Sequence, residues 1–169
     1  MTDSIFLVGF MGSGKSEVGR ELARRLNWSF VDLDEEISRS AGCSIPDIFA
    51  GEGERGFRKR EREALIRYLP ATQTVVSCGG GIVTQPENVS DLQTNPGTVC
   101  LQVSSEEAWK RVGGDANRPL VSGDQPEQRL RDLMAERQPL YASFPLQVST
   151  DGFRSSEVVD QVLSELRNL

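Results

Sequence analysis

The fold is decided by residues 9–16, which read Gly9-Phe10-Met11-Gly12-Ser13-Gly14-Lys15-Ser16. They match in full the pattern G-x-x-x-x-G-K-[ST], whose glycines let backbone N–H groups converge on a phosphate. In this pattern Lys15 neutralises oxygens of the β- and γ-phosphates, and the hydroxyl of Ser16 ligates Mg²⁺. A helix predicted to open at Lys15 adds its positive dipole end. The alternative is a glycine-rich turn with an incidental lysine. We expect the nucleotide to be bound by Gly12, Ser13, Gly14, Lys15 and Ser16.

Strands and helices alternate on both sides of this loop. The apolar patterning predicts strands at Ile5–Val8, 30–34, 74–77, 98–103 and 146–148. Helical spacing predicts helices at 17–26, 35–41, 54–69, 105–111, 128–141 and 156–166. Such alternation is typical of an α/β fold with a parallel sheet covered on both faces. The pattern itself does not fix the strand order.

The bulk composition narrows the class of protein. A chain of 169 residues fits a single domain, 1–169, with a core large enough to need no disulfide or metal. The net charge of −6 gives no reason to expect binding to nucleic acid or to a membrane. The amino terminus does not resemble a signal peptide, and the widely spaced Cys43, Cys78 and Cys100 form no metal-ligand pair. We expect a cytoplasmic protein whose cysteines are reduced thiols in or near the core.

Carboxylates after the second strand are candidates for chemistry. The chain contains no histidine, so a catalytic base must be a carboxylate, Lys, Tyr or Cys. The third strand runs into glycines without an acid, which leaves Asp32 as the candidate to orient Mg²⁺ through water. Asp34 is expected to orient an acceptor hydroxyl and take its proton. Either aspartate could instead cap the next helix.

Further candidates lie in segments that could surround an acceptor. Arg58 and Glu61 share a helix face, although a solvated face with ion pairs is the simpler interpretation of the charge-rich residues 52–67. The glycines at 79–81 allow a ligand to approach the backbone, or form only a tight turn. Residues 112–125 contain three glycines and one proline without apolar periodicity, and are predicted to form a mobile loop.

Taken together, these short motifs resemble the shikimate kinase family across nearly the whole chain. The resemblance rests on the phosphate loop with Val18-Gly19-Arg20, on Asp32-x-Asp34, Phe57-Arg58-x-x-Glu61, Gly79-Gly80-Gly81, Arg118-Pro119-Leu120 and Glu136-Arg137-x-Pro139-Leu140-Tyr141. It implies a five-stranded parallel sheet of order 2-3-1-4-5. It also implies Mg²⁺-dependent phosphorylation of the 3-hydroxyl of shikimate by ATP, a step of aromatic amino acid biosynthesis.

The resemblance also implies roles for particular residues. Asp34 would hold the acceptor hydroxyl, and Arg58 and Arg137 would pair with the shikimate carboxylate. Glu61 would buttress the pocket, within a substrate-binding segment at 33–61. The glycines would line the pocket floor: Gly79, Gly80 and Gly81. Arg118 would lie on a lid, residues 112–125, and reach the transferred phosphate. Planar guanidinium groups suit both carboxylate and phosphoryl partners.

One segment departs from the family pattern, and other functions remain to be weighed. In the family, adenine is often held between an arginine before the lid and a later loop that contains a proline. Arg111 matches that arginine, but the later segment 150–155 has no proline. Our candidates to cover the second face of adenine are therefore Arg154 or the backbone of this segment. A gluconate kinase, a nucleoside monophosphate kinase and a nucleotide-binding regulatory module without catalysis are the alternatives. The sequence does not set the number of subunits, and a monomer is expected.

Overall fold

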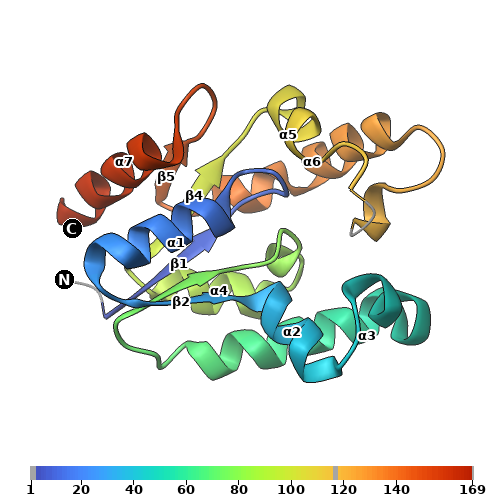
Figure 1. Ribbon diagram of the computed structural model, residues 1–169, viewed down its shortest axis with the longest axis horizontal. Coiled ribbons are helices and arrows are strands. Elements are labelled where there is room, and N and C mark those ends of the chain that lie inside the picture. The colour runs from blue at the N-terminus through green and yellow to red at the C-terminus, as the bar shows by residue number, and fades with distance from the viewer. Residues whose placement is uncertain (1–2, 116–117, 169) are drawn as a thin grey trace.

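The centre of the molecule is a parallel five-stranded sheet (Figure 1). The computed structural model describes residues 3–115 and 118–168. Its strands are β1 (Ser4–Val8), β2 (Ser29–Asp32), β3 (Thr74–Ser77), β4 (Thr98–Gln102) and β5 (Leu146–Ser149). They pair in the order β2-β3-β1-β4-β5, and every pairing is parallel. This order confirms the one that the family resemblance implies.

Helices cover both faces of the sheet because the central strands are apolar on both sides. On one face, α1 (Lys15–Leu26) and α7 (Ser155–Arg167) lie side by side over Leu7, Val75 and Leu101 (Figure 1). On the other face, Phe6, Val76 and Cys100 belong to a second core cluster. The elements that supply it are α2 (Leu33–Ala41), α3 (Ile45–Tyr68), α4 (Pro86–Thr94), α5 (Ser105–Val112) and α6 (Pro126–Ala142).

The carboxyl ends of the strands all face the same edge of the sheet, as parallel pairing requires. The α2–α3 segment and residues 118–125, which precede α6, project beyond this edge (Figure 1). In open parallel sheets a ligand binds in the crevice outside the carboxyl ends of the strands. The fold therefore brings the phosphate loop and two projecting segments around one site.

Several sequence predictions need correction near this edge. The predicted strand 30–34 ends at Asp32, which caps α2 by accepting hydrogen bonds from the backbone N–H groups of Asp34 (3.0 Å) and Glu35 (3.4 Å). Asp34 therefore lies in the first turn of a helix and not at a strand end. Helix α4 was not predicted from the sequence. Cys43 is exposed, in contrast to the predicted core thiols, whereas Cys78 and Cys100 are buried.

The helix predicted at 54–69 begins much earlier, at Ile45, and is broken once. Ser44 caps its start in a reciprocal pair with Asp47, whose carboxylate accepts from the Ser44 backbone N–H. Gly53 interrupts it with φ 70° and ψ −179°, a backbone conformation that is essentially confined to glycine. The break lies inside the predicted substrate-binding segment.

Replacing Gly53 by alanine is expected to destabilise the protein by about 1–3 kcal/mol. An added Cβ would meet no atom within 4 Å, so the cost comes from the backbone conformation alone. Gly51 is the matched control, because it is helical and equally unhindered. Gly51→Ala should stabilise the protein by about 0.5–1 kcal/mol. Urea denaturation of both variants measures the difference, and equal shifts would show that the break is not a rigid part of the fold.

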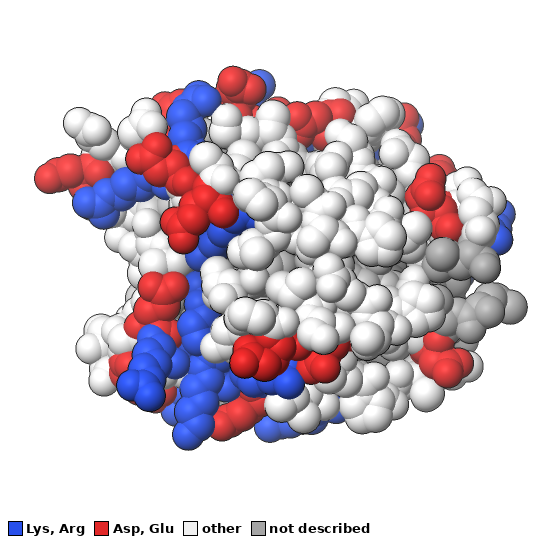
Figure 2. All heavy atoms as spheres, turned by 180° about the vertical axis from the view of Figure 1, so that it is seen from behind, with Lys and Arg blue, Asp and Glu red and all other residues white. Residues whose placement is uncertain are grey.

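The predicted loop 112–125 is only partly described, since Ala116 and Asn117 lie outside the described residues. Its remainder contains a short 3₁₀ turn at Pro119–Val121. Within residues 3–115 and 118–168, no helix is both long and apolar enough to cross a membrane. Figure 2 shows charged side chains gathered around a hollow at one edge of the molecule, beside a broad uncharged surface.

Candidate active site

Three adjoining pockets lie along the carboxyl edge of the sheet. The phosphate pocket, about 310 Å³, is lined by Gly12, Gly14, Lys15 and Ser16 of the phosphate loop. It shares Asp34, Gly79 and Arg118 with a second pocket, here called the acceptor pocket. At its other end it shares Gly14 and Arg111 with a third, the outer pocket, of about 500 Å³. The three pockets therefore form one continuous row, with the phosphate pocket in the middle.

Every residue predicted for the site lines one or more of these pockets. In the phosphate pocket these are Gly12, Gly14, Lys15, Ser16, Asp32, Asp34, Gly79, Gly80, Arg111 and Arg118. In the acceptor pocket they are Asp34, Arg58, Glu61, Gly79, Gly80, Gly81, Arg118 and Arg137. In the outer pocket they are Ser13, Gly14, Arg111 and Arg154. Residues that are far apart in the sequence are thus assembled by the fold.

The phosphate loop holds its lysine over its own backbone. Lys15 Nζ donates to the carbonyl oxygens of Gly9 (2.7 Å) and Phe10 (2.9 Å), and to Ser13 Oγ (3.2 Å). Gly12 and Gly14 have φ of 77° and 85°, which a side chain would strain. Burial, and next the nearby positive charge of Arg118, lower the pKa of Lys15 to about 8. The lysine is therefore a buried cation that an incoming anion would stabilise.

Oxygen atoms from two strand ends meet the first turn of α1. Ser16 Oγ donates to Asp32 Oδ2 and lies 3.5 Å from Ser77 Oγ. The two strand residues are paired in register, Asp32 on β2 with Ser77 on β3. Ser77 was not predicted as a site residue. Its polar side chain at the end of the predicted third strand could have indicated it.

The side chains of Asp34 and Glu61 each have one carboxylate oxygen beside Gly79. An added Cβ on Gly79 would lie 2.7 Å from Glu61 Oε1 and 2.9 Å from Asp34 Oδ1. Both oxygens are buried, and neither has a hydrogen-bond partner among the described residues. Burial, then the negative charge of Asp32, raise the pKa of Asp34, and burial raises the pKa of Glu61 to about 7. A donor group entering this space would satisfy both acceptors.

Two buried arginines line the same pocket. Arg58 donates to Glu61 Oε2 (2.9 Å) and Glu54 Oε1 (3.1 Å), and its guanidinium lies where a side chain on Gly81 would be. Within the described part of the chain, the Nε atoms of Arg58 and Arg137 are buried without an acceptor. Such donors cost free energy unless an acceptor arrives. The arrangement suits a planar anion such as a carboxylate.

Tyr141 holds the backbone of the glycine run that forms the floor of this pocket. Tyr141, quoted in the sequence motif without a role, donates its hydroxyl to the carbonyl of Gly80, and its ring packs edge-on against Phe10 of the phosphate loop. A side chain on Gly80 would come within 3.2 Å of the backbone N of Met11. The glycine run and the phosphate loop are therefore in direct contact.

Comparison with known proteins agrees with this geometry. The family model described as "Shikimate kinase" matches residues 11–167. The chain belongs to the shikimate kinase family. It is 44% identical over 167 residues to a shikimate kinase of Synechococcus sp. (strain RCC307), covering 98% of this chain and 85% of that relative. With the shikimate kinase of Moorella thermoacetica the identity is 42%, covering 99% of this chain and 96% of that one.

Solved structures of shikimate kinases share the fold. One is described as shikimate kinase from Acinetobacter baumannii in complex with shikimate. It superposes with a TM-score of 0.95 at 38% identity, covering 99% of this chain and 94% of that chain. The family that the motifs predicted is thereby confirmed.

Proposed function

We propose that this chain transfers the γ-phosphate of ATP to the 3-hydroxyl of shikimate, giving shikimate 3-phosphate and ADP. The acceptor pocket beside the phosphate loop is the observation that supports the proposal. There, Nε of Arg58, Nε of Arg137 and Oδ1 of Asp34 are buried and have no hydrogen-bond partner among the residues that the structure describes. A small hydroxy acid supplies both the carboxylate and the hydroxyl that these groups require. Membership of the shikimate kinase family supports the same substrate.

Residues of the phosphate pocket and of the acceptor pocket have different roles in phosphoryl transfer. Backbone N–H groups of residues 12–16 and the ammonium of Lys15 hold the β- and γ-phosphates. Asp34 orients the attacking hydroxyl and accepts its proton. Its raised pKa makes it a stronger base than an exposed aspartate. Arg118 lies close enough to Lys15 and Asp34 to affect the pKa of each, and stabilises charge on the group in transit.

Mg²⁺ fits the oxygen atoms near Ser16. Among the described residues no cluster of three or more carboxylate, thiol or imidazole groups could form a cage for a metal. Mg²⁺ characteristically keeps several waters and uses one or two carboxylates together with substrate phosphates. Ser16 and Asp32, with Ser77 nearby, offer such a partial set. When bound there, the ion would neutralise charge on the β- and γ-phosphate oxygens.

The acceptor pocket is narrow as described, which favours a lid that moves. Its volume is about 60 Å³, well below the ~300 Å³ of a small ligand pocket. Arg118, Pro119 and Leu120 form part of its wall and belong to the predicted lid, 112–125. We propose that this segment moves aside to admit shikimate and closes over it, which excludes water. Residues 33–61 would form the opposite, substrate-binding side of a single domain, 1–169.

The molecule as a whole is proposed to act as a monomer in the cytoplasm, without nucleic acid or membrane partners. Its net charge of −6 disfavours polyanionic partners and confines anion binding to local clusters of arginine and lysine.

A coupled assay of ADP release tests the proposed reaction. The purified protein would be given ATP and Mg²⁺ with shikimate, gluconate or AMP as acceptor. We expect rapid turnover with shikimate only. Turnover with gluconate or AMP instead would reassign the substrate, and binding of ATP without turnover on any acceptor would favour a regulatory module.

Arg58→Lys and Arg137→Lys are each expected to weaken shikimate binding about 10- to 100-fold. Lysine keeps the charge but cannot offer two coplanar donors to a carboxylate, and a hydrogen bond to a charged group contributes ~1.5–3 kcal/mol. Titration calorimetry with shikimate measures the loss. Arg60→Lys is the matched control, since Arg60 lies on the same helix as Arg58 and pairs with Glu52 outside the pocket. Parent-like binding by both pocket variants would assign the two arginines to structure alone.

A further inference from the structure

The outer pocket has room for the base of a nucleotide bound at the phosphate loop. It adjoins the phosphate pocket through Gly14, Glu17 and Arg111, at the end of the phosphate loop away from the acceptor pocket. A nucleotide whose phosphates rest on residues 12–16 could extend its ribose and base into this pocket without entering the acceptor pocket. The residues around the outer pocket are Ser13, Gly14, Glu17, Val18, Arg111, Thr150, Phe153, Arg154, Ser155, Ser156 and Val158.

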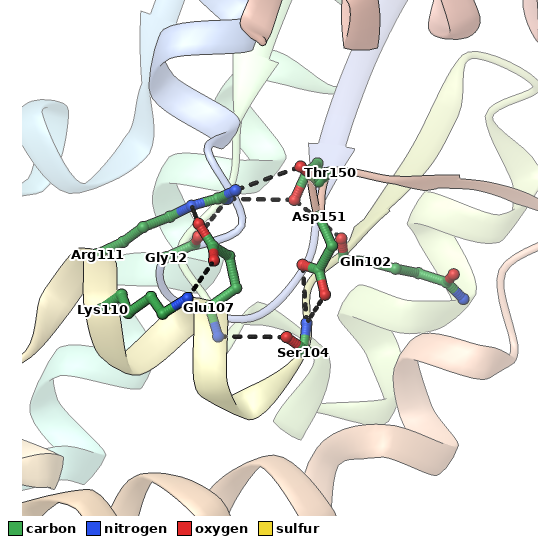
Figure 3. A network of polar contacts seen from close by, with 8 residues as sticks. All are labelled: Gly12, Gln102, Ser104, Glu107, Lys110, Arg111, Thr150 and Asp151. Atoms are coloured by element: carbon green, nitrogen blue, oxygen red, sulfur yellow. Dashed lines mark hydrogen bonds and ion pairs between the residues drawn. The ribbon is translucent and has the colours of Figure 1, made fainter. Parts of the chain in front are cut away.

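Arg111 is fixed as a flat wall of this pocket (Figure 3). From α5 its guanidinium donates to the Gly12 carbonyl (2.9 Å), to Thr150 Oγ1 (3.2 Å) and to the Thr150 carbonyl (3.3 Å). Its Nε donates to Glu107 Oε1 (3.2 Å). Guanidinium donors lie in the plane of the group, so these contacts hold its edges. A guanidinium group held by its edges can stack on a ring through one of its faces.

The segment after β5 is a second rigid feature of the pocket. Thr150 donates its backbone N–H to the Gln102 carbonyl (2.9 Å), and the carboxylate of Asp151 accepts from the Ser104 N–H (3.1 Å), as Figure 3 shows. Phe153 N–H closes a turn by donating to the Thr150 carbonyl (3.3 Å), with Gly152 at φ 76°. Phe153 is thus held in place by the backbone that precedes it.

Phe153 is exposed although its backbone is fixed. Among the described residues it is one of two large apolar side chains classed as exposed, at 47%. The other, Ile66 at 49%, is not part of the outer pocket. Arg154, the candidate from the sequence, has a side chain that is 82% exposed and is engaged by Glu157 (3.3 Å). An aromatic ring stacks on any base without needing a particular hydrogen-bond pattern.

We propose that Phe153 stacks on the face of the nucleotide base that Arg111 leaves uncovered. This assigns to Phe153 the place for which the sequence offered Arg154. The proposal rests on the proposed use of ATP, and it makes Phe153 a binding residue for the donor with no part in the acceptor pocket.

Calorimetry with ADP tests the assignment without any acceptor. Phe153→Ala should weaken ADP about tenfold, equivalent to ~1.4 kcal/mol and within the range for one aromatic–base stack. Phe153→Trp, which restores a stacking surface, should bind like the parent. Inorganic triphosphate has no base, so Phe153→Ala should leave its affinity unchanged. In turnover the KM for ATP should rise while kcat and the KM for shikimate stay the same.

Two matched variants complete the experiment. Ile66→Ala removes the other exposed apolar side chain and should leave ADP affinity unchanged. Arg154→Ala should change it less than twofold. Parent-like ADP binding by Phe153→Ala, or an equal loss for inorganic triphosphate, would overturn the proposal, as would a larger loss in Arg154→Ala. Because ADP binding needs no shikimate, failure of the proposed acceptor would leave this test intact.

Discussion

Lys15→Ala is expected to lower kcat at least about 10²- to 10³-fold and to leave the protein folded. A preorganised donor aimed at developing charge contributes on this scale when it lies in a site shielded from water. Lys15 meets that description, since it is buried and hydrogen-bonded to the loop that would cradle the phosphates. Steady-state turnover of ATP with shikimate measures the loss.

Stability distinguishes this result from simple misfolding. Burial lowers the pKa of Lys15 to about 8, so the fold bears a cost for keeping the ammonium charged at neutral pH. Removing the side chain relieves that cost and leaves two carbonyls without their donor, so we expect little net change in Tm. Lys59, which is exposed on α3, provides the control, and Lys59→Ala should behave like the parent. Unchanged kcat in a folded Lys15→Ala would refute the assignment of the phosphate loop.

Local sequence signals predicted most of the sheet. The third strand was predicted at its observed bounds, because a short apolar run bounded by turn residues is a local pattern. The order of strands came only from the family resemblance. Strand order is determined by contacts between segments far apart in the chain, such as β1 between β3 and β4, which no local pattern records.

Errors occurred where local preferences conflicted with tertiary structure. Gly51 and Gly53 weaken the helical pattern at the start of α3. The predicted start of that helix, residue 54, was therefore too late. Helix α4 was missed because it is polar, with only Asn88 and Leu92 buried. The role proposed for Phe153 could not be recognised from the sequence, since it depends on a turn that the structure positions at the same pocket as Arg111.

The residues of the candidate site also differ in how far adjacent residues alone could predict them. Phosphate-loop residues are contiguous and so were predictable from the residues alone. The acceptor residues come from the segments around Asp34, Arg58, Gly79 and Arg137, and only the fold or the family pattern brings them together. Their individual roles stay predictions, and Asp34 offers the most discriminating test of them.

Asp34→Asn is expected to lower kcat by about 10²- to 10⁴-fold, the usual contribution of general base catalysis. Asparagine retains the size of the side chain and its place in the first turn of α2 but cannot accept a proton at neutral pH. ADP affinity should stay close to that of the parent, because Asp34 is proposed to bind the acceptor hydroxyl and not the nucleotide. Asp160→Asn, on the exposed surface of α7, is the matched control and should retain full activity.

Thermal stability should change in the opposite direction to activity. Burial raises the pKa of folded Asp34 above its unfolded value, so the folded state holds this proton more tightly. The stability that the protonated side chain contributes is present at low pH and is lost as pH rises through the folded pKa. At neutral pH the parent therefore bears the cost of a buried charge, which the asparagine removes. We expect a higher Tm for Asp34→Asn at pH 7.5, and a smaller Tm difference between the two proteins at pH 4. A variant that loses both activity and Tm would instead identify Asp34 as a structural residue of the acceptor pocket.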